Sequence, residues 1–301
     1  MTTEQTIAVK SYHLPASGRL ADYWALTKPD INLMIAIATF AGFYLGYPSQ
    51  LANFPVLRLI QTVLGTALVA AGTSTLNQYI ERRFDAQMRR TARRPVASGR
   101  LKPTSALWFG IGLSTAGSIF LAAAVSLLAS LLAVLTLLSY LFVYTPLKRR
   151  TPFCTLIGAV PGAMPPLIGW AAASGSLTPA ACSLCLFVFL WQFPHFMAIA
   201  WMYREDYDRA GYQVLPRGRA RVRLVVLQTV LPLVVLAVLT VAARPVAPPS
   251  YAAVASLLSM SFVYYGARFA RHTSNVDARK LLFASIVYLP ALFALMIIYR
   301  T

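Results

Sequence analysis

Residues 56–85 read VLRLIQTVLGTALVAAGTSTLNQYIERRFD, and this stretch decides the class of fold. Its first part, 56–76, is an apolar run, and its second part, 77–85, is dense in polar and charged side chains. An apolar run of about 20 residues has the length of a helix that crosses the hydrocarbon core of a bilayer. The stretch therefore predicts a transmembrane helix that ends in a charged segment at the membrane surface.

The same apolar pattern recurs along the whole chain of 301 residues. Hydrophobic residues make up 58% of the chain and charged residues only 12%, which excludes an ordinary soluble globular domain. The candidate spans fall at 31–47, 56–76, 105–123, 125–144, 155–172, 178–200, 222–242, 250–268 and 281–299. We expect an all-α integral membrane protein of about nine transmembrane helices, with residues 1–301 forming a single membrane domain.

The basic residues indicate how these helices cross the membrane. With the N-terminus inside, the inner connecting segments are 1–28, 77–104, 145–152, 201–223 and 266–280. They hold 24 of the 27 Lys and Arg residues, and only Arg58, Arg244 and Arg300 lie elsewhere. Because cytoplasmic loops carry the excess of Lys and Arg, the pattern predicts an N-in, C-out topology. This topology also explains most of the net charge of +18 without nucleic acid as a partner.

Acidic residues gather in two of these inner segments, although the chain has only nine of them. Asn77, Glu81 and Asp85 are spaced four residues apart, so a continuing helix places them on one face. Glu205 and Asp206 follow the sixth span on the same side of the membrane. Mg²⁺ takes oxygen ligands and commonly bridges a few carboxylates to substrate phosphates. The two clusters therefore predict a Mg²⁺ site at the inner membrane surface.

Basic side chains surround both clusters; they are Arg89, Arg90, Arg93, Arg94, Lys148, Arg149, Arg150, Arg204 and Arg209. Carboxylates and cations beside an apolar bundle suit a substrate with a diphosphate head and an apolar tail. For any single arginine, we favour a role as a topological anchor. The row of Asn77, Glu81 and Asp85, called the acidic row below, needs a different explanation, because the positive-inside rule does not account for acidic residues.

Four stretches resemble the UbiA superfamily of intramembrane prenyltransferases: NQYIERRFDAQMRRTARRP (77–95), YTPLKRRTPFCTLIGAVPGAMPPLIGW (144–170), WQFPHFMAIAWMYREDY (191–207) and AGYQVLP (210–216). The acidic motifs indicate the superfamily, and the MRRT, LKRRT, GAMPPLIGW and PHF segments resemble its haem-modifying branch. One departure concerns Glu81, which stands where the family motif has Asp. The carboxylate is kept, but it reaches one methylene further.

The resemblance implies a central chamber in a bundle and a reaction at its cytoplasmic face. A farnesyl group would pass from farnesyl diphosphate to a vinyl group of haem b, and water would add to give haem o and diphosphate. The implied Mg²⁺ ligands are Asn77, Glu81, Asp85, Glu205 and Asp206. Lys148 and the substrate-binding residues Arg89, Arg93, Arg94, Arg149 and Arg204 would hold the diphosphate and stabilise its growing charge.

Two further side chains are expected to meet substrate. His195 in the PHF segment lies in an apolar span, where an imidazole is costly without a role, and it would ligate haem iron or carry a proton. Tyr144 would shield the farnesyl cation with its ring. Pro161, Pro165 and Pro166 should break or kink the span at 155–172, which places that helix beside the chamber.

Two alternatives stay open at this point. Another UbiA-type enzyme would prenylate a quinone precursor or chlorophyllide, but it would lack the MRRT, LKRRT and PHF segments. A secondary transporter would keep ionisable residues near the middle of the membrane, whereas these acids cluster at one face. The N-terminal segment resembles neither a transit peptide nor a signal peptide, so we expect a bacterial plasma membrane. Besides the lipid bilayer and the two substrates, a haem a synthase or terminal oxidase assembly proteins are candidate partners.

Overall fold

The computed structural model describes residues 18–47, 53–216, 218–242 and 249–299. Residues 1–17 of the predicted inner N-terminal segment lie outside this part of the chain, as do Arg217, Arg244 and Arg300. Within it, every long element is a helix, in agreement with the all-α prediction.

Nine long helical segments match the nine predicted spans in the described part of the chain. They are α2 (Pro29–Gly46), α3 (Val56–Asp85), α4 (Pro103–Ala124), α5 with η2 and α6 (Leu127–Leu138, Ser139–Tyr144 and Thr145–Leu147), α7 with α8 (Cys154–Gly162 and Met164–Ser174), α9 (Pro179–Met202), α11 (Arg219–Ala242), α12 (Pro249–His272) and α13 (Asn275–Ile298). Two short helices, α1 (Arg19–Leu26) and α10 (Arg204–Arg209), complete the order. Eight of the nine segments are long and apolar enough to cross a membrane. The exception is α12, whose serines and tyrosines lower its hydropathy.

Helix ends follow from local chemistry. Proline opens α2, α4 and α9 at the first helical position, where its missing N–H costs nothing because no helical carbonyl would have accepted it. Ser126 and Ser274 cap the N-termini of α5 and α13, each accepting a hydrogen bond from a backbone N–H three residues later. The helices with these signals start within two residues of the predicted spans, except α13, which starts six residues before the predicted position 281.

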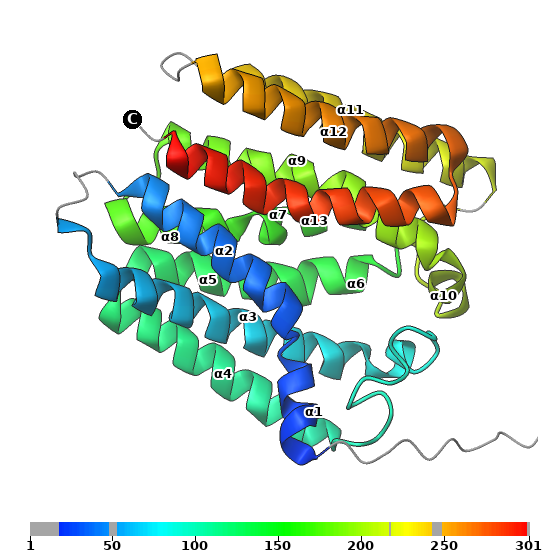
Figure 1. Cartoon of the computed structure of the whole chain (residues 1–301). Helices are drawn as coiled ribbons and strands as arrows, with labels where there is room; N and C mark the ends of the chain where they lie inside the picture. The colour runs from blue at the N-terminus through cyan, green and yellow to red at the C-terminus, as the bar shows by residue number, and fades with distance from the viewer. Residues whose placement is uncertain (1–17, 48–52, 217, 243–248, 300–301) are drawn as a thin grey trace, which may run out of the picture.

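Figure 1 shows α11 and α12 along one edge of the bundle and α3 and α4 along the opposite edge, with α2, α8, α9 and α13 between them. One apolar core joins α9, α11, α12 and α13 around buried side chains such as Phe262, Tyr288 and Phe293. A second core joins α3, α4, α5 and α8 around Phe43 and Leu121. Helix α2 contributes to both cores, so it ties the two sides of the bundle together.

The predicted break in the 155–172 span is present. Helix α7 ends at Gly162 and α8 starts at Met164, with Pro165 and Pro166 in the first turn of α8. Gln192 of α9 fills the space beside Gly162 and donates a hydrogen bond to the Ala159 carbonyl at 3.0 Å. The irregular backbone is thus buried against protein, as the bilayer requires.

The predicted inner segments meet at one end of the bundle. Lys28 contacts Asn77 at 3.4 Å, and Lys148 contacts Glu81 at 2.6 Å. The Gln213 N–H donates to the Lys148 carbonyl at 2.7 Å, and Arg204 donates to Asn275 at 2.9 Å. All five segments that carry the basic residues therefore lie on the same side, which agrees with the prediction that two spans separate each inner segment from the next.

Glycines allow α2 and α8 to approach closely. A Cβ on Gly169 would lie 2.7 Å from the Phe43 N–H nitrogen and closer still to the Thr39 carbonyl oxygen. A Cβ on Gly42 would meet the Pro166 carbonyl oxygen. Since these neighbours are backbone atoms, they cannot swing away from an added methyl group.

We therefore expect Gly169→Ala to destabilise the protein by about 1–3 kcal/mol, because it overpacks this contact. The matched control is Gly112→Ala, since nothing lies within 4 Å of a Cβ at Gly112 on α4. That control should leave stability unchanged or raise it by up to about 1 kcal/mol, because alanine favours a helix. Thermal unfolding in detergent measures both, and equal midpoints for the two variants would contradict the close contact.

Candidate active site

Glu81 is the centre of a buried polar cluster at the inner end of the bundle. Its Oε1 accepts hydrogen bonds from Lys148 Nζ at 2.6 Å and from the Tyr212 hydroxyl at 2.8 Å. Its Oε2 accepts one from Asn77 Nδ2 at 2.9 Å. Asn77 in turn accepts from Lys28 Nζ at 3.4 Å through its Oδ1. Both carboxylate oxygens are engaged, so the burial of Glu81 is compensated by three partners, from α3, the segment after α6 and the segment after α10.

The acidic row continues because α3 extends to Asp85 without a break. Arg94 donates from its Nη1 to both carboxylate oxygens of Asp85, at 2.9 and 2.8 Å, and forms an ion pair with it. Thr91 donates to the Asp85 carbonyl at 2.9 Å and holds the following loop against the helix end. The predicted spacing of Asn77, Glu81 and Asp85 therefore gives a row of three buried side chains.

The structure separates the two acids of the second cluster. Asp206 is buried and accepts hydrogen bonds from the Arg90 backbone N–H at 3.1 Å and from Arg209 at 3.3 Å. Its contact with Arg90 brings it to the loop that follows Asp85. Glu205 instead points outward, with a side chain that is 75% exposed and 3.9 Å from Arg204. Asp206 therefore joins the first cluster, and Glu205 does not.

The two lysines of this cluster, Lys28 and Lys148, have opposite pKa shifts. Burial lowers the pKa of Lys148, but the charge of Glu81 and its hydrogen bond outweigh this effect, so that pKa is raised. The pKa of Lys28 falls to about 7, because burial and the positive charge of Arg94 outweigh the nearby carboxylates. Lys28 also adopts a left-handed backbone with φ of 50°, which is strained for a residue other than glycine.

Three residues of this cluster were not predicted from the sequence. Lys28 immediately precedes Pro29 at the start of a span, where it resembles a topological anchor. Thr145 accepts a hydrogen bond from Asn77 Nδ2 at 3.2 Å. Tyr212 lies in the AGYQVLP stretch, which is one of the four that carry the family resemblance, so that stretch could have pointed to it. Burial and the charge of Glu81 raise the pKa of Tyr212, so its hydroxyl stays a hydrogen-bond donor.

A basic pocket of about 290 Å³ adjoins the acidic row. It is lined by Ala25, Lys28, Gln78, Arg90, Arg93, Arg94, Pro95 and Arg100. The predicted residues Arg93 and Arg94 are therefore placed together, and Lys28 joins this pocket to Asn77. A cavity with this many cations and no acidic lining favours an anionic group.

The other predicted residues are spread around the cluster. Tyr144 lies under Lys148, whose Nζ is 4.9 Å from the ring centroid. Arg149 stacks on Phe84 at 4.7 Å, and Arg204 stacks on Trp201 at 4.9 Å. Arg89 is exposed, and His195 lies deeper in α9, hydrogen-bonded to Ser285 of α13.

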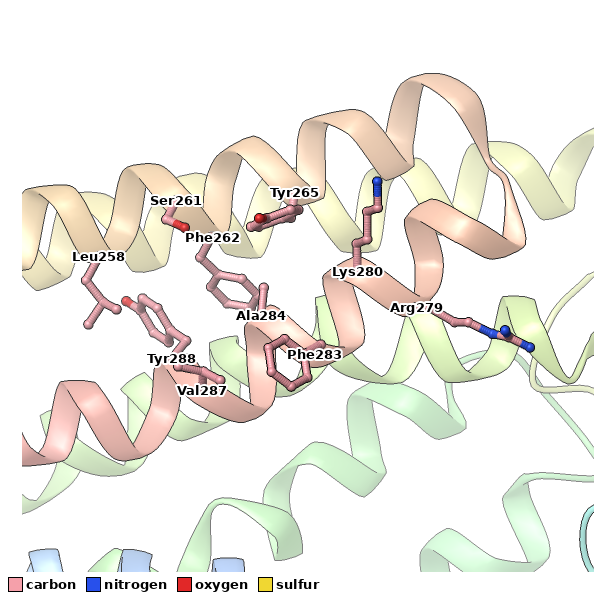
Figure 2. Close-up of a pocket in the computed structure, with 10 residues that line it drawn as sticks. All are labelled: Leu258, Ser261, Phe262, Tyr265, Arg279, Lys280, Phe283, Ala284, Val287 and Tyr288. Carbon is pink, nitrogen blue, oxygen red and sulfur yellow. The ribbon is translucent and has the colours of Figure 1, made fainter.

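A larger pocket of about 440 Å³ lies between α12 and α13 (Figure 2), and it shares no lining residue with the cluster around Glu81. Figure 2 shows Phe262, Tyr265 and Tyr288 along it, with Lys280 rising toward α12 and Arg279 pointing away. Its walls are aromatic and aliphatic, and none of its lining residues is a carboxylate. It therefore lacks the ligands that a metal-bound diphosphate needs.

The side chains of this cluster include the oxygen ligands that a hard divalent cation needs, but they are not arranged around a single point in this structure. Asn77, Glu81, Asp85 and Asp206 offer oxygen ligands, which Mg²⁺ prefers. In this structure each carboxylate is held by Lys or Arg, and among the described residues no three acidic, Cys or His side chains converge on one point. A cation would therefore have to replace Lys148 and Arg94 as the partner of Glu81 and Asp85.

Comparison with known proteins places this site in a family. The model of the UbiA prenyltransferase family matches residues 35–287. A protoheme IX farnesyltransferase from Solibacter usitatus is 45% identical over 294 residues, covering 93% of this chain and 99% of that protein. One from Salinibacter ruber is 40% identical over 285 residues, covering 93% of this chain and 98% of that protein.

Solved structures agree on the fold. A digeranylgeranylglyceryl phosphate synthase has a TM-score of 0.72 at 18% identity and covers 93% of this chain and 98% of its own. A UbiA homologue from Archaeoglobus fulgidus, described as bound to GPP and Mg²⁺, has a TM-score of 0.64 at 15% identity and covers 91% of this chain and 99% of its own.

The resemblance found in the four sequence stretches is thereby confirmed, and the apolar helices belong to a multi-pass membrane protein. Since the family model covers most of the chain, and relatives align along nearly their whole length, the chain belongs to the UbiA prenyltransferase family.

Proposed function

We propose that the protein transfers the farnesyl group of farnesyl diphosphate to a vinyl group of haem b, with addition of water, giving haem o and diphosphate. The observation that carries this proposal is the set of relatives named protoheme IX farnesyltransferase, which are 37–45% identical along most of the chain. The polar cluster at the end of an apolar bundle is suited to the two halves of such a substrate.

The proposed diphosphate site is the cluster around Glu81. Asn77, Glu81, Asp85 and Asp206 would bind Mg²⁺, and Glu205 would join them by turning its exposed carboxylate inward. The bound cation would neutralise the diphosphate and favour its departure. Lys148 and Arg94, released from their carboxylates, would turn to the diphosphate oxygens, where charge grows as the allylic C–O bond breaks. The remaining arginines, Arg89, Arg93, Arg149 and Arg204, would attract the anionic head to this face.

The apolar side of the same cluster suits the farnesyl cation. The ring centroids of Tyr140 and Tyr144, both in η2, lie 5.1 Å apart, and Tyr144 faces Lys148. Their π-faces would shield a delocalised cation, while the surrounding bundle excludes bulk water. The vinyl group then forms the new C–C bond, and water captures the cation left on the vinyl carbon and loses a proton. No nucleophilic side chain of the protein is required.

The proposed orientation places this site at the cytoplasmic face of a bacterial plasma membrane. Residues 1–301 would form one membrane domain, with 1–28, 77–104 and 201–223 inside. The positive-inside rule supports this orientation, because 24 of 27 Lys and Arg residues lie in the predicted inner segments. A haem a synthase or terminal oxidase assembly proteins would receive the product.

The orientation is tested by cysteine labelling in intact cells and inverted vesicles. The variants are Ser98→Cys in the loop after α3 and Ser176→Cys between α8 and α9, in a chain whose own three cysteines are replaced by serine. A membrane-impermeant maleimide should label Ser98→Cys only in inverted vesicles and Ser176→Cys only in intact cells. The opposite pattern would reverse the orientation.

The acidic site is tested with two neighbouring aspartates. Asp206→Asn should lower haem o formation by on the order of 100-fold, because it removes a proposed Mg²⁺ ligand. The control, Asp208→Asn, should stay within a few-fold of wild type, since Asp208 pairs with Arg221 at 2.8 Å and not with the cluster. Membranes are incubated with haem b, farnesyl diphosphate and Mg²⁺, and the extracted haems are identified by mass. Equal activity in both variants would refute the assignment, and prenylation of an aromatic acceptor instead of haem would refute the proposed substrate.

Variants of the Glu81–Lys148 ion pair can separate an effect on stability from an effect on activity. Lys148→Met should destabilise the protein by about 3–5 kcal/mol, because the buried Glu81 carboxylate loses its ion-pair partner. The double variant Lys148→Met with Glu81→Gln should regain most of the thermal stability, since both charges are gone. It should still form no haem o, because the diphosphate site has lost its lysine and a metal ligand. Recovered activity in the double variant would disprove the proposed roles.

A further inference from the structure

His195 lies inside α9, seven residues before the helix ends at Met202, or about 10 Å below that end. Its Nδ1 is 2.8 Å from Ser285 Oγ on α13. Its ring stacks on Trp191, with ring centroids 4.9 Å apart and planes at 27°. Trp191 is itself fixed by a hydrogen bond of 2.8 Å from its indole N–H to the Ser285 carbonyl. The position and plane of the imidazole are therefore set by two residues on two helices.

The hydrogen bonds of Ser285 decide which nitrogen of His195 carries the proton. Ser285 Oγ lies 2.6 Å from the Leu282 carbonyl oxygen, which can only accept. The hydroxyl proton must lie between these two oxygens, because otherwise two acceptors would face each other at 2.6 Å. Ser285 Oγ then has only lone pairs to offer His195, so Nδ1 must be the donor. The imidazole is held as the Nδ1–H tautomer, and Nε2 has a free lone pair.

The surroundings keep this imidazole neutral. Nε2 makes no hydrogen bond to any residue that the structure describes, and the side chain is only partly covered. Among the residues that the structure describes, Trp191 and Phe196 are in ring contact with His195, and no carboxylate pairs with it. A protonated imidazole would be an uncompensated charge in an apolar span, which is costly. An Nε2 lone pair in such a place suits a metal better than a proton.

We propose that Ser285 is a positioning residue that holds His195 in the Nδ1–H tautomer, so that Nε2 ligates the iron of the haem substrate. Histidines that bind metals generally donate their other N–H to an acceptor, which fixes the ring and raises its basicity. The inference rests on the proposed function, because it takes haem as the substrate. It assigns the acceptor role to a serine on α13, outside all four stretches that carry the family resemblance.

The test uses purified protein in detergent, titrated with ferric haem b in the absence of farnesyl diphosphate. The wild type should show the optical and electron paramagnetic resonance spectra of histidine-ligated haem. His195→Gly should lose this signature, and added imidazole should restore it. Ser285→Ala should weaken haem binding about 10-fold or more and alter the spectrum, whereas Ser285→Thr, which keeps the hydroxyl, should resemble the wild type.

Ser118→Ala is the matched control, because Ser118 donates the same kind of hydrogen bond to a carbonyl four residues earlier on α4, at 2.8 Å. It should leave both haem binding and its spectrum unchanged. Thermal unfolding of all variants shows which of them are folded, and imidazole rescue of His195→Gly tests the ligand without any change at Ser285.

Three results would overturn the inference. The first is a wild-type spectrum that His195→Gly does not change. The second is a Ser285→Ala spectrum and affinity equal to those of the wild type. The third is haem o formation that falls in His195→Gly with a shifted pH profile but unchanged haem spectra, which would make His195 a proton carrier. Haem o formation is measured in parallel, so failure of the proposed function appears as absent product and is distinguishable from an absent ligand signature.

Discussion

The buried ion pair between Glu81 and Lys148 is the interaction on which the inner end of the protein depends. Either charge alone would be costly at this depth, so α3 and the segment after α6 must meet there. Once they meet, Tyr212 and Asn77 complete the shell of Glu81, and Asn77 reaches Lys28 before α2. One carboxylate thus fixes the relative positions of segments that are more than 100 residues apart in sequence.

Such an ion pair contributes little net stability, since the cost of desolvating both charges offsets their attraction. The stability of the bundle comes instead from the two apolar cores and from close glycine contacts such as Gly169 against α2. The ion pair is nevertheless well suited to a site that exchanges charges. In the proposed site, an arriving cation would replace Lys148 as the partner of Glu81, and an arriving diphosphate would replace Glu81 as the partner of Lys148.

Local features of the site could be predicted from the sequence, and features that depend on tertiary contacts could not. The spacing of Asn77, Glu81 and Asp85 is a property of one helix, and the prolines around residue 163 break the span by their own chemistry. Glu205 and Asp206 look equivalent in sequence, but neighbours on a helix point in directions about 100° apart, so only Asp206 faces the cluster. Lys28 enters the site through a left-handed backbone conformation that only the surrounding packing stabilises.

The basic residues were the hardest to assign, because two requirements place them on the same surface. The positive-inside rule needs cations at the cytoplasmic face, and the proposed entry of an anionic substrate head from that face would need them too. Burial separates the two groups. Lys148 is 9% exposed and pairs with a buried carboxylate, whereas Arg83 on α3 is exposed. A cation that serves topology alone stays hydrated, and desolvation is a cost that only a functional or structural partner compensates.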